Sequence, residues 1–410
     1  MTTENDKTFL VQNRDIVIIS IQPWYYEMGS NCKNIALELS KHNRVLYVNI
    51  PITRKTFFNK NETAGVKKHC GIIRKKQNAI EQINEQMWQF YPTTLIESIN
   101  WIPVTRIFSF INKINNIRFA SDIRKAIKQL NFENIILFND NDIYNGFYLK
   151  ELLSPSLYIY YMRDFLQGYS FWRKHSSKSE PQLIQKADLV VTNSLYYQEY
   201  CSKFNATSTY IGQGCKLNLF DPESVVQVPG DLHHIPKPKV GYVGALDSSR
   251  LDHNIIRIIA EHNSNWQVVL VGPEDESFRQ SKLHEIPNIH FLGARSIDLL
   301  PAYIKDFDVC MNPQQINFIT NGNYPLKIDE YLAMGKATIA TRTKAMQLFE
   351  KHVSLAETAE DYPTLIEHLL AEESDKNKIQ SRIIFAKSHT WENSIKLLYE
   401  AIKKNEKSSI

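Results

Sequence analysis

The sequence predicts an α/β protein made of two tandem domains, each built around a parallel sheet. The chain has 410 residues, more than one hydrophobic core usually organises, so two domains of about 200 residues each are expected. Short apolar runs rich in β-branched residues alternate with amphipathic runs in both halves. The alternation stops at a proline-containing segment near residue 230 and then restarts, which indicates a domain boundary there.

The first half begins with a strand, a helix and a second strand. Residues 15–21 (DIVIISI) are expected to be a strand, the stretch NIALELSKH is an amphipathic helix, and RVLYVNI is the next strand. This order is a βαβ unit, whose connection implies parallel strands with a ligand crevice at their carboxyl ends. Further strands, with helices between them, are expected at residues 134–139, 157–162, 189–194 and 209–214.

The second half repeats the alternation after a predicted linker that contains four prolines and has no clear period. Its expected strands are KVGYVGAL, WQVVLVG, IHFLG, VCMNP and ATIAT, with helical stretches between them. The last helical stretch, WENSIKLLYEAIKKNEKS, is expected to cross back to the first domain. The predicted organisation is a first domain at 1–220, a linker at 221–238, a second domain at 239–388 and a returning helix at 389–410.

Composition excludes several classes of protein. Hydrophobic residues make up 43% and charged residues 22%, which are ordinary globular values. The net charge of +4 is too small to argue for nucleic acid. Five scattered cysteines without metal-ligand spacing predict a reducing compartment and no structural zinc. The polar N-terminus and the lack of a long uncharged run predict a cytoplasmic protein without signal peptide or membrane span.

The stretch NYPLKIDEYLAMGKATIAT, residues 323–341, carries the strongest functional signal. Lys327 and Glu330 lie three residues apart at the start of an otherwise apolar helix, so both side chains share one helix face. A helix N-terminus has partial positive charge and unpaired N–H groups, which suit an anion. We therefore expect a nucleotide, with its phosphate on Lys327 and the amides and its ribose hydroxyls on Glu330. The alternative is an exposed ion pair between the two side chains.

Three other loops follow predicted strands. YVGALDSSRLD leaves a strand through Gly244 and reaches Arg250, which offers a two-pronged contact for a diphosphate. EMGSNCKN places Gly29 before the first helix, where the neighbouring Ser and Asn are also good helix caps. YMRDFLQGY puts Arg163 and Asp164 at a strand end, either as site residues or as a simple ion pair.

Two neighbouring segments are rich in basic and aromatic residues. Residues 54–76 carry many Lys and Arg against the single Glu62, and residues 101–119 (WIPVTRIFSFINKINNIRF) combine aromatic and basic side chains on a predicted helix. This pattern is typical of a helix at a membrane surface. A core helix with a solvated basic face is the alternative interpretation.

Several motifs are discounted. The triplets DFD at 306–308 and DND at 140–142 match the acidic motif of metal-dependent sugar transferases, but such triplets arise easily by chance, and Asp308 is expected to be structural. The 12 histidines show no metal-ligand spacing. There is no Walker A loop, GxGxxG, GxSxG or kinase motif set. No metal site and no cofactor are therefore predicted.

With these motifs in order, the chain resembles bacterial glycosyltransferases of the two-domain glycosyltransferase-B (GT-B) fold, family 4-like (group 1), of surface polysaccharide assembly. The blocks YVGALDSSRLD, WQVVLVGP, NIHFLGARSIDLLPAYIKDFDVCMNP and YPLKIDEYLAMGKATIAT match the donor domain. The pattern P-x-K-x-x-E-Y-L-A-x-G-K is the most specific of them. The first domain matches less well, and residues 56–131 agree only in general character.

The resemblance implies roles for individual residues. Glu330 would hold the ribose hydroxyls, Lys327 and Arg250 the diphosphate, and Arg295 the base. The backbone around Asn323, Pro325 and Leu326 would hold the phosphates or the donor sugar. The family often has a Glu eight residues before the ribose Glu, and here that position is Gly322, which leaves the donor sugar open. Family 4-like enzymes retain the anomeric configuration and need no metal.

The leading interpretation is therefore a hexosyltransferase, cytoplasmic or at the inner face of the cell membrane. It would use a UDP or GDP sugar and a glycan or lipid-linked acceptor. Lys327 and Arg250 would stabilise the leaving diphosphate, and Asp164 is the candidate for the acceptor base. A nucleotide-sugar epimerase of the same fold is the alternative enzyme, although no acidic and histidine set for it can be assigned. A non-catalytic scaffold is the third interpretation, and the intact nucleotide motif disfavours it.

Overall fold

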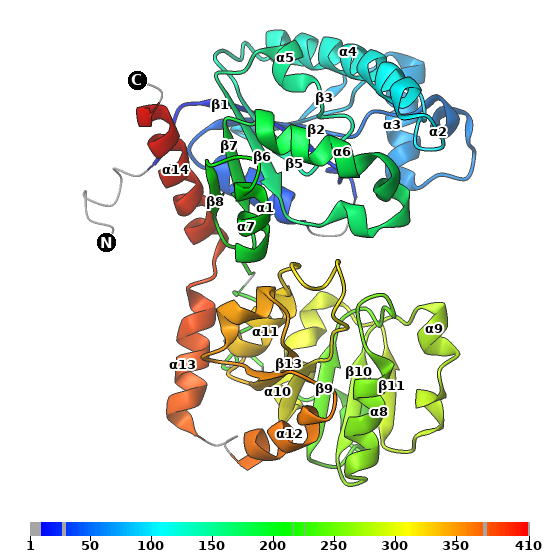
Figure 1. The fold of residues 1–410 in the computed structure, drawn as a ribbon, viewed down its shortest axis with the longest axis vertical. Helices are drawn as coiled ribbons and strands as arrows, with labels where there is room; N and C mark the ends of the chain where they lie inside the picture. Colours follow the sequence, from blue (N-terminus) through cyan, green and yellow to red (C-terminus); the bar gives the residue numbers. More distant parts are fainter. Residues whose placement is uncertain (1–9, 27–29, 216, 226, 372–374, 409–410) are drawn as a thin grey trace. The chain divides into compact units, whose positions relative to one another are not determined.

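The computed structural model describes residues 10–26, 30–215, 217–225, 227–371 and 375–408 of the chain. It divides into two compact units, the first made of Met1–Gly212 with Trp391–Ile410 and the second of Gln213–Thr390. Each unit has one sheet with helices packed on it (Figure 1). The predicted fold class, an α/β protein with two parallel-sheet domains, is confirmed.

The first unit contains an eight-stranded sheet among its described residues, in the order β3-β4-β2-β1-β5-β6-β7-β8. Its strands are β1 (Asp15–Ser20), β2 (Arg44–Val48), β3 (Ile80–Asn84), β4 (Met87–Phe90), β5 (Ile136–Asp140), β6 (Leu157–Met162), β7 (Leu189–Thr192) and β8 (Ser208–Tyr210). Its helices are α1 (Asn31–Leu39), α2 (Arg54–Phe58), α3 (Ala64–Lys75), α4 (Thr105–Gln129), α5 (Leu149–Leu153), α6 (Ser170–Lys186), α7 (Leu195–Ser202) and α14 (Trp391–Ser408).

Burial on both faces explains the strand sequences of the first unit. Every residue of β1, β5 and β6 is buried, as expected for parallel strands covered by helices on both sides. β3 alone runs antiparallel to its neighbour, β4, and the sequence did not predict this hairpin. β3 has the burial pattern of an edge strand, with Ile80 buried and the next four residues, of which Ile83 alone is apolar, partly or fully exposed. Its mixed polarity hides the apolar run that marks a strand elsewhere in this chain.

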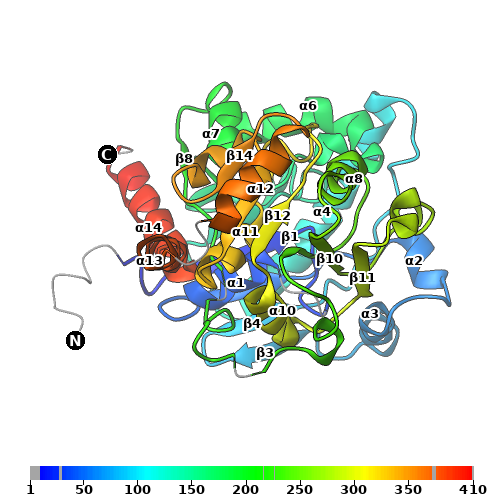
Figure 2. The same ribbon diagram turned by 90° about the horizontal axis from the view of Figure 1, so that it is seen from below.

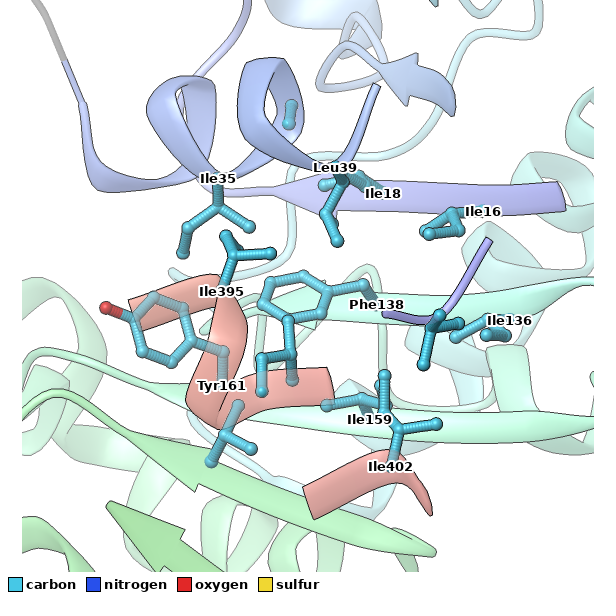
Figure 3. Close-up of a cluster of buried hydrophobic side chains, with 14 of the residues drawn as sticks. Ile16, Ile18, Ile35, Leu39, Ile136, Phe138, Ile159, Tyr161, Ile395 and Ile402 are labelled. Carbon is cyan, nitrogen blue, oxygen red and sulfur yellow. The ribbon is translucent and has the colours of Figure 1, made fainter. Parts of the chain in front are cut away.

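The C-terminal helix α14 completes the core of the first unit. Its side chains Ile395, Leu398 and Ile402 are buried in the same cluster as residues of α1 and the central strands. Figure 3 shows Ile395 and Ile402 among the side chains of α1, β1, β5 and β6. Polar contacts add to this packing, since Asn43 Nδ2 donates to the Tyr399 hydroxyl at 3.0 Å. The returning helix predicted from the sequence is confirmed.

The second unit contains a six-stranded, fully parallel sheet among its described residues, in the order β11-β10-β9-β12-β13-β14. Its strands are β9 (Lys239–Val243), β10 (Gln267–Val271), β11 (Ile289–Gly293), β12 (Val309–Asn312), β13 (Ala337–Thr341) and β14 (Ser354–Ala356). Its helices are α8 (His253–His262), α9 (Glu276–Arg279), α10 (Leu300–Asp306), α11 (Leu326–Ala333), α12 (Asp361–Ala371) and α13 (Lys376–Lys387).

Two hydrophobic layers enclose this second sheet. Figure 2 shows α8 and α12 on one side of the sheet and α10 on the other. The predicted linker belongs to the second layer in the structure, because Leu232 and Ile235 are buried in the cluster that contains residues of α10 and α11. Gly335 ends α11 with φ of +74°, and a Cβ there would lie 2.8 Å from Ile379 of α13. A glycine is therefore required both by the backbone and by the close packing of α13.

Candidate functional site

The carboxyl ends of β9, β12 and β13 bring together the strongest sequence motifs in the second unit. β9 lies next to β12, and β12 next to β13, so the loops that follow them leave the same edge of the sheet. Gly244 comes directly after β9, and α11 begins shortly after β12. This is the edge at which parallel α/β sheets bind ligands. The structure thus places Gly244 beside the α11 motif, as the sequence predicts.

Gly244 and Lys327 are in close contact. Gly244 has φ of +138°, and a Cβ at this position would lie 3.1 Å from Cε and 3.3 Å from Nζ of Lys327. The Lys327 ammonium also lies 4.7 Å from the ring centroid of the buried Tyr242. A cation over an aromatic ring is attracted to its π face. The missing side chain of the glycine and the ring of the tyrosine thus allow the ammonium to lie close to the carboxyl end of β9.

Glu330 is the second charged group on this face of α11. Burial raises the pKa of its carboxyl group to about 7, while the charge of Lys327 opposes this shift and that of Asp329 adds to it. Among the residues that the structure describes, no hydrogen bond or ion pair engages the Glu330 carboxylate, and none joins it to Lys327. The predicted alternative, an ion pair between these two side chains, is therefore absent from the described part of the chain. A partly buried carboxylate without a partner is costly unless a ligand binds it.

The neighbouring Asp329 differs from Glu330 because its bonds lie within the fold. It is fully buried, and its two oxygens contact the Tyr324 hydroxyl and Nδ1 of His389, both at 2.7 Å. Burial raises the pKa of Asp329, and the contacts with His389 oppose that rise. These bonds tie the first turn of α11 to the loop before it and to the chain after α13. Sequence reasoning missed Asp329 and His389, which are 60 residues apart.

The start of α11 has no side-chain cap. Pro325 occupies the N-cap position and offers no side-chain acceptor to the first N–H groups of the helix, which begins at Leu326. The preceding Asn323 is partly exposed, and Tyr324 is buried. An uncapped helix start with a lysine beside it matches the requirements of a phosphate group.

Buried polar atoms without partners lie close in sequence to these strand ends. Asn312 is the last residue of β12, and both atoms of its side-chain amide are buried without a hydrogen bond among the described residues. Gln314 Oε1 and Thr343 Oγ1 are in the same condition. Each such atom has a free-energy cost of about 1–3 kcal/mol when unsatisfied. Nothing in the local sequence distinguishes these residues, so they could not have been identified before the structure.

The two predicted arginines of the second unit are in different situations. Arg250 lies in a loop held by the chain after β12, since Gln315 N donates to its carbonyl at 2.8 Å, and its Nε lies 3.7 Å from Asp247 Oδ2. Arg295 follows β11 and is engaged on both sides, donating to the Tyr303 hydroxyl at 2.7 Å and to Asp231 at 2.8 Å. The guanidinium of Arg295 is therefore already paired with an acid in the second unit.

In the first unit the predicted charged residues form a network with one another. Arg163 donates from Nε to Asp140 at 2.7 Å and from Nη1 to Asp164 at 2.5 Å. Asp140 is fully buried and also accepts from the Ser20 hydroxyl at 2.5 Å. The ion pair that the sequence offered as an alternative for Arg163 and Asp164 is present. Gly29 lies outside the described residues.

The discounted acidic triplets have structural partners. Asp306 is paired with Lys239, and Asp308 accepts from the Lys239 backbone N–H at 2.6 Å and pairs with Lys237 at 2.5 Å. Asp142 accepts hydrogen bonds from the backbone of the turn that follows β5. The expectation that Asp308 is structural is confirmed.

None of the helices in the described part of the chain has both the length and the apolar composition of a membrane-spanning helix.

A protein-family model matches part of the chain. Residues 237–372 match the model of the family described as glycosyl transferases group 1. The predicted family resemblance is confirmed. The match to group 1 glycosyl transferases lies inside the second unit and includes Gly244, Lys327 and Glu330. It covers the four blocks that suggested a donor domain. The match therefore supports the prediction of a transferase.

A curated relative extends the likeness to group 1 glycosyl transferases. TuaH of Bacillus subtilis (strain 168), named as a glycosyltransferase of teichuronic acid biosynthesis, is 24% identical over 233 residues. The match covers 54% of this chain and 58% of the relative, which is less than two thirds of the relative's length.

Solved structures with the same fold match nearly the whole chain. Sucrose-phosphate synthase from Thermosynechococcus elongatus has a TM-score of 0.69 at 14% identity, covering 97% of this chain and 100% of that one. HepE of Anabaena in complex with UDP has a TM-score of 0.62 at 14% identity, with 97% and 100% covered. These likenesses show the fold, which is the GT-B fold predicted from the sequence.

Proposed function

We propose that this protein is a glycosyltransferase that moves a hexose, or a derivative of one, from a nucleotide-diphosphate sugar to an acceptor in surface polysaccharide assembly. The observation that carries the proposal is the pair Lys327 and Glu330. Both project from the uncapped start of α11, and neither has an ionic partner among the described residues. A nucleoside diphosphate supplies the missing partners, because its phosphates need cations and its ribose diol donates to a carboxylate.

The chemistry requires stabilisation of the leaving diphosphate. The bond between the sugar's anomeric carbon and the diphosphate oxygen breaks as the acceptor hydroxyl forms the new bond, so negative charge develops on the diphosphate. Lys327, Arg250 and the backbone N–H groups of Asn323 and Leu326 would stabilise that charge. Pro325, which lies between them, has no N–H group and offers only its carbonyl. Such stabilisation needs no metal. We propose retention of anomeric configuration on the strength of the family resemblance alone.

The acceptor proton requires a base, and Asp164 is the proposed one. It lies just after β6, is about one-quarter exposed, and pairs with Nη1 of Arg163 at 2.5 Å. An Asp164→Asn variant keeps the shape of the side chain and removes its charge. If Asp164 is the base, the variant will lose transfer to acceptor and keep its affinity for the donor nucleotide. Unchanged transfer would show that Asp164 is not the base and that its ion pair with Arg163 is purely structural.

The donor class is proposed from the site, with support from structures of a protein that shares the fold. HepE has been crystallised with UDP, with UDP and glucose, and with UDP-glucose. We therefore propose a UDP sugar first and a GDP sugar second. Purified protein incubated with radiolabelled UDP and GDP sugars without acceptor should slowly hydrolyse one of them, and Glu330→Ala should abolish that hydrolysis. Binding and hydrolysis of none of these donors would overturn the proposal, and epimerised sugar would identify the epimerase instead.

We further propose that the protein works at an anionic membrane surface. Residues 54–76 and 101–119 expose Lys55, Lys67, Arg106 and Lys113 together with apolar side chains. Each basic residue near an anionic surface contributes about 1 kcal/mol. The protein should co-sediment with anionic vesicles and be released by high salt. Equal binding to neutral vesicles, or no binding to anionic ones, would contradict this.

A further inference from the structure

The first unit contains an apolar cavity of about 270 Å³ at the carboxyl edge of its sheet. Its walls come from the residues after β1, β2 and β5, from the segment before α4, from α4 itself and from the start of α6. The apolar lining side chains include Ile21, Ile50, Ile99, Tyr144, Phe171 and Trp172. The cavity is open to solvent, and its volume is just below the usual range for small-molecule sites, about 300–1,000 Å³. It therefore admits a segment of a larger molecule.

The buried polar side chains of the lining are already satisfied by the protein. Asn115 donates to the Glu97 carbonyl and accepts from the Glu97 N–H, both at 2.9 Å. Asp142 accepts from the N–H groups of Tyr144 and Asn145 at 3.2 and 2.9 Å. These groups have little capacity left for a ligand. The part of a ligand that enters the cavity must therefore be apolar.

Exposed apolar side chains continue from the cavity mouth. Phe171 lines the cavity and is 62% exposed, and Trp101, which directly follows the lining residue Asn100, is 74% exposed. The two segments are joined, because His175 of α6 contacts the Ile102 carbonyl at 3.0 Å and stacks on Phe108 of α4. Large exposed aromatic side chains on two segments that pack together are uncommon on a protein surface without an apolar partner.

Two arginines pair with Glu97 at the cavity wall. Glu97 lines the cavity and pairs with Arg54 at 2.7 Å and Arg118 at 3.0 Å. One carboxylate is thus shared by two guanidinium groups, so this group of three side chains carries one net positive charge beside the cavity. The outer ends of both arginines are partly exposed. Their charge is complementary to an anion attached to an apolar chain.

We propose that this cavity binds the hydrocarbon chain of a lipid-linked acceptor, next to a phosphate or diphosphate that lies near Arg54 and Arg118. The proposal rests on the proposed function, because it names the class of acceptor that the transferase would use. The cavity supplies apolar contact for the part of the chain next to the phosphate. The remaining chain would follow the exposed Trp101 and Phe171.

The test compares three probes on the intact protein. Geranyl diphosphate carries chain and charge, inorganic diphosphate carries charge alone, and dihexanoyl phosphatidylglycerol represents a membrane lipid. Binding is measured by titration calorimetry and by the emission of Trp172, with Trp172→Phe assigning the signal. We expect geranyl diphosphate to bind at least tenfold more tightly than either of the other two, since each buried methylene contributes about 0.8 kcal/mol.

Two variants separate the cavity from the surface around it. Ser98→Phe should fill the cavity and weaken the binding of geranyl diphosphate tenfold or more. The control is Phe110→Ser, which changes an aromatic residue outside the lining that is about as exposed as Phe171. Phe171→Ser at the mouth should weaken the probe several-fold and serves if Ser98→Phe lowers the melting temperature. Equal binding of geranyl and inorganic diphosphate, or equal binding by wild type and a folded Ser98→Phe variant, would overturn the proposal. Tighter binding of phosphatidylglycerol would assign the cavity to membrane lipid and also overturn it.

UDP or GDP affinity is measured on the same samples. If the wild-type protein binds geranyl diphosphate but neither UDP nor GDP, the proposed function is wrong, while the inference that the cavity binds a hydrocarbon chain is retained. Intact nucleotide binding without recognition of the geranyl chain would overturn only the inference about the acceptor.

Discussion

The two sheets of this protein have charged residues at their carboxyl edges, and these residues are used differently. In the second unit, Lys327 and Glu330 share a helix face without pairing, and Glu330 has no hydrogen bond to its carboxylate among the described residues. In the first unit, Arg163 is bonded to both Asp140 and Asp164. Removing one partner of a buried ion pair destabilises the fold, whereas a charge without an ionic partner in the fold can bind a ligand at little cost to stability. The difference predicts which substitutions affect binding and which affect stability.

The largest effect on binding is expected at Glu330. Glu330→Ala removes two charge-assisted hydrogen bonds to the ribose, worth roughly 3–6 kcal/mol in total, so donor affinity should fall a hundredfold or more. Fold stability should change little, because the loss of a charge at a helix start costs about 0.3–1 kcal/mol. Glu330→Gln should fall between. Melting temperature and donor affinity are measured on the same samples, and a variant that melts early but binds donor normally would end the functional interpretation of this motif.

The counterpart in the first unit is Arg163. Arg163→Ala leaves the fully buried Asp140 with the Ser20 hydroxyl as its one remaining side-chain partner among the described residues, and such a broken pair costs roughly 3–5 kcal/mol of folding free energy. Urea unfolding measures this loss. Asp140→Asn in the Arg163→Ala background removes the stranded charge and should recover part of the stability. If Arg163→Ala unfolds like the wild type, the network is not what stabilises this sheet edge.

Lys327→Ala should weaken diphosphate binding by about 1.5–3 kcal/mol and leave stability almost unchanged. The loss of the contact with Tyr242 removes only about 0.5–1 kcal/mol from the fold. UDP should lose more affinity than UMP, or GDP more than GMP, because the second phosphate adds charge for the lysine. Equal losses for the diphosphate and the monophosphate would show that Lys327 does not contact the diphosphate.

A fourth expected effect is a linkage to pH, which again separates the two units. Burial raises the pKa of Glu330 and of Glu180, which lies on α6, to about 7. Both groups therefore hold a proton in the folded protein at pH values where the unfolded chain has lost it. Each stabilises the fold fully below the unfolded value near 4.5 and loses that contribution as the pH rises through 7.

Only Glu330 should couple this titration to the donor. The ribose diol donates to the ionised carboxylate, so donor binding should release a proton from Glu330 below pH 7, and affinity should rise with pH across that range. Calorimetry in buffers of different ionisation enthalpy measures the released proton. Glu330→Gln should abolish the release, and the matched control Glu180→Gln should retain it. Release that persists in Glu330→Gln would assign the proton to another group.

Short-range features of the donor site could be predicted from the sequence because they depend on residues close together in the chain. The three-residue spacing of Lys327 and Glu330 places them on one helix face wherever that helix lies. The position of Gly244 directly after an apolar strand likewise indicates a turn at a sheet edge. The alternation of strands and helices predicted two parallel sheets, since fully buried strands consist of continuous apolar runs. The hairpin of β3 and β4 was missed because its polar residues give no such run.

The partners of each charged group were decided by the tertiary structure. The sequence itself determined that Arg163 lies beside Asp164 and that Asp329 lies beside Glu330. Folding determined that Asp140 reaches Arg163 from another strand, and that His389, 60 residues away, bonds Asp329 and not Glu330. The apolar cavity of the first unit is likewise assembled from six separate segments. Pairing and cavity shape depend on distances of a few ångströms between segments far apart in the chain, and local spacing does not contain that information.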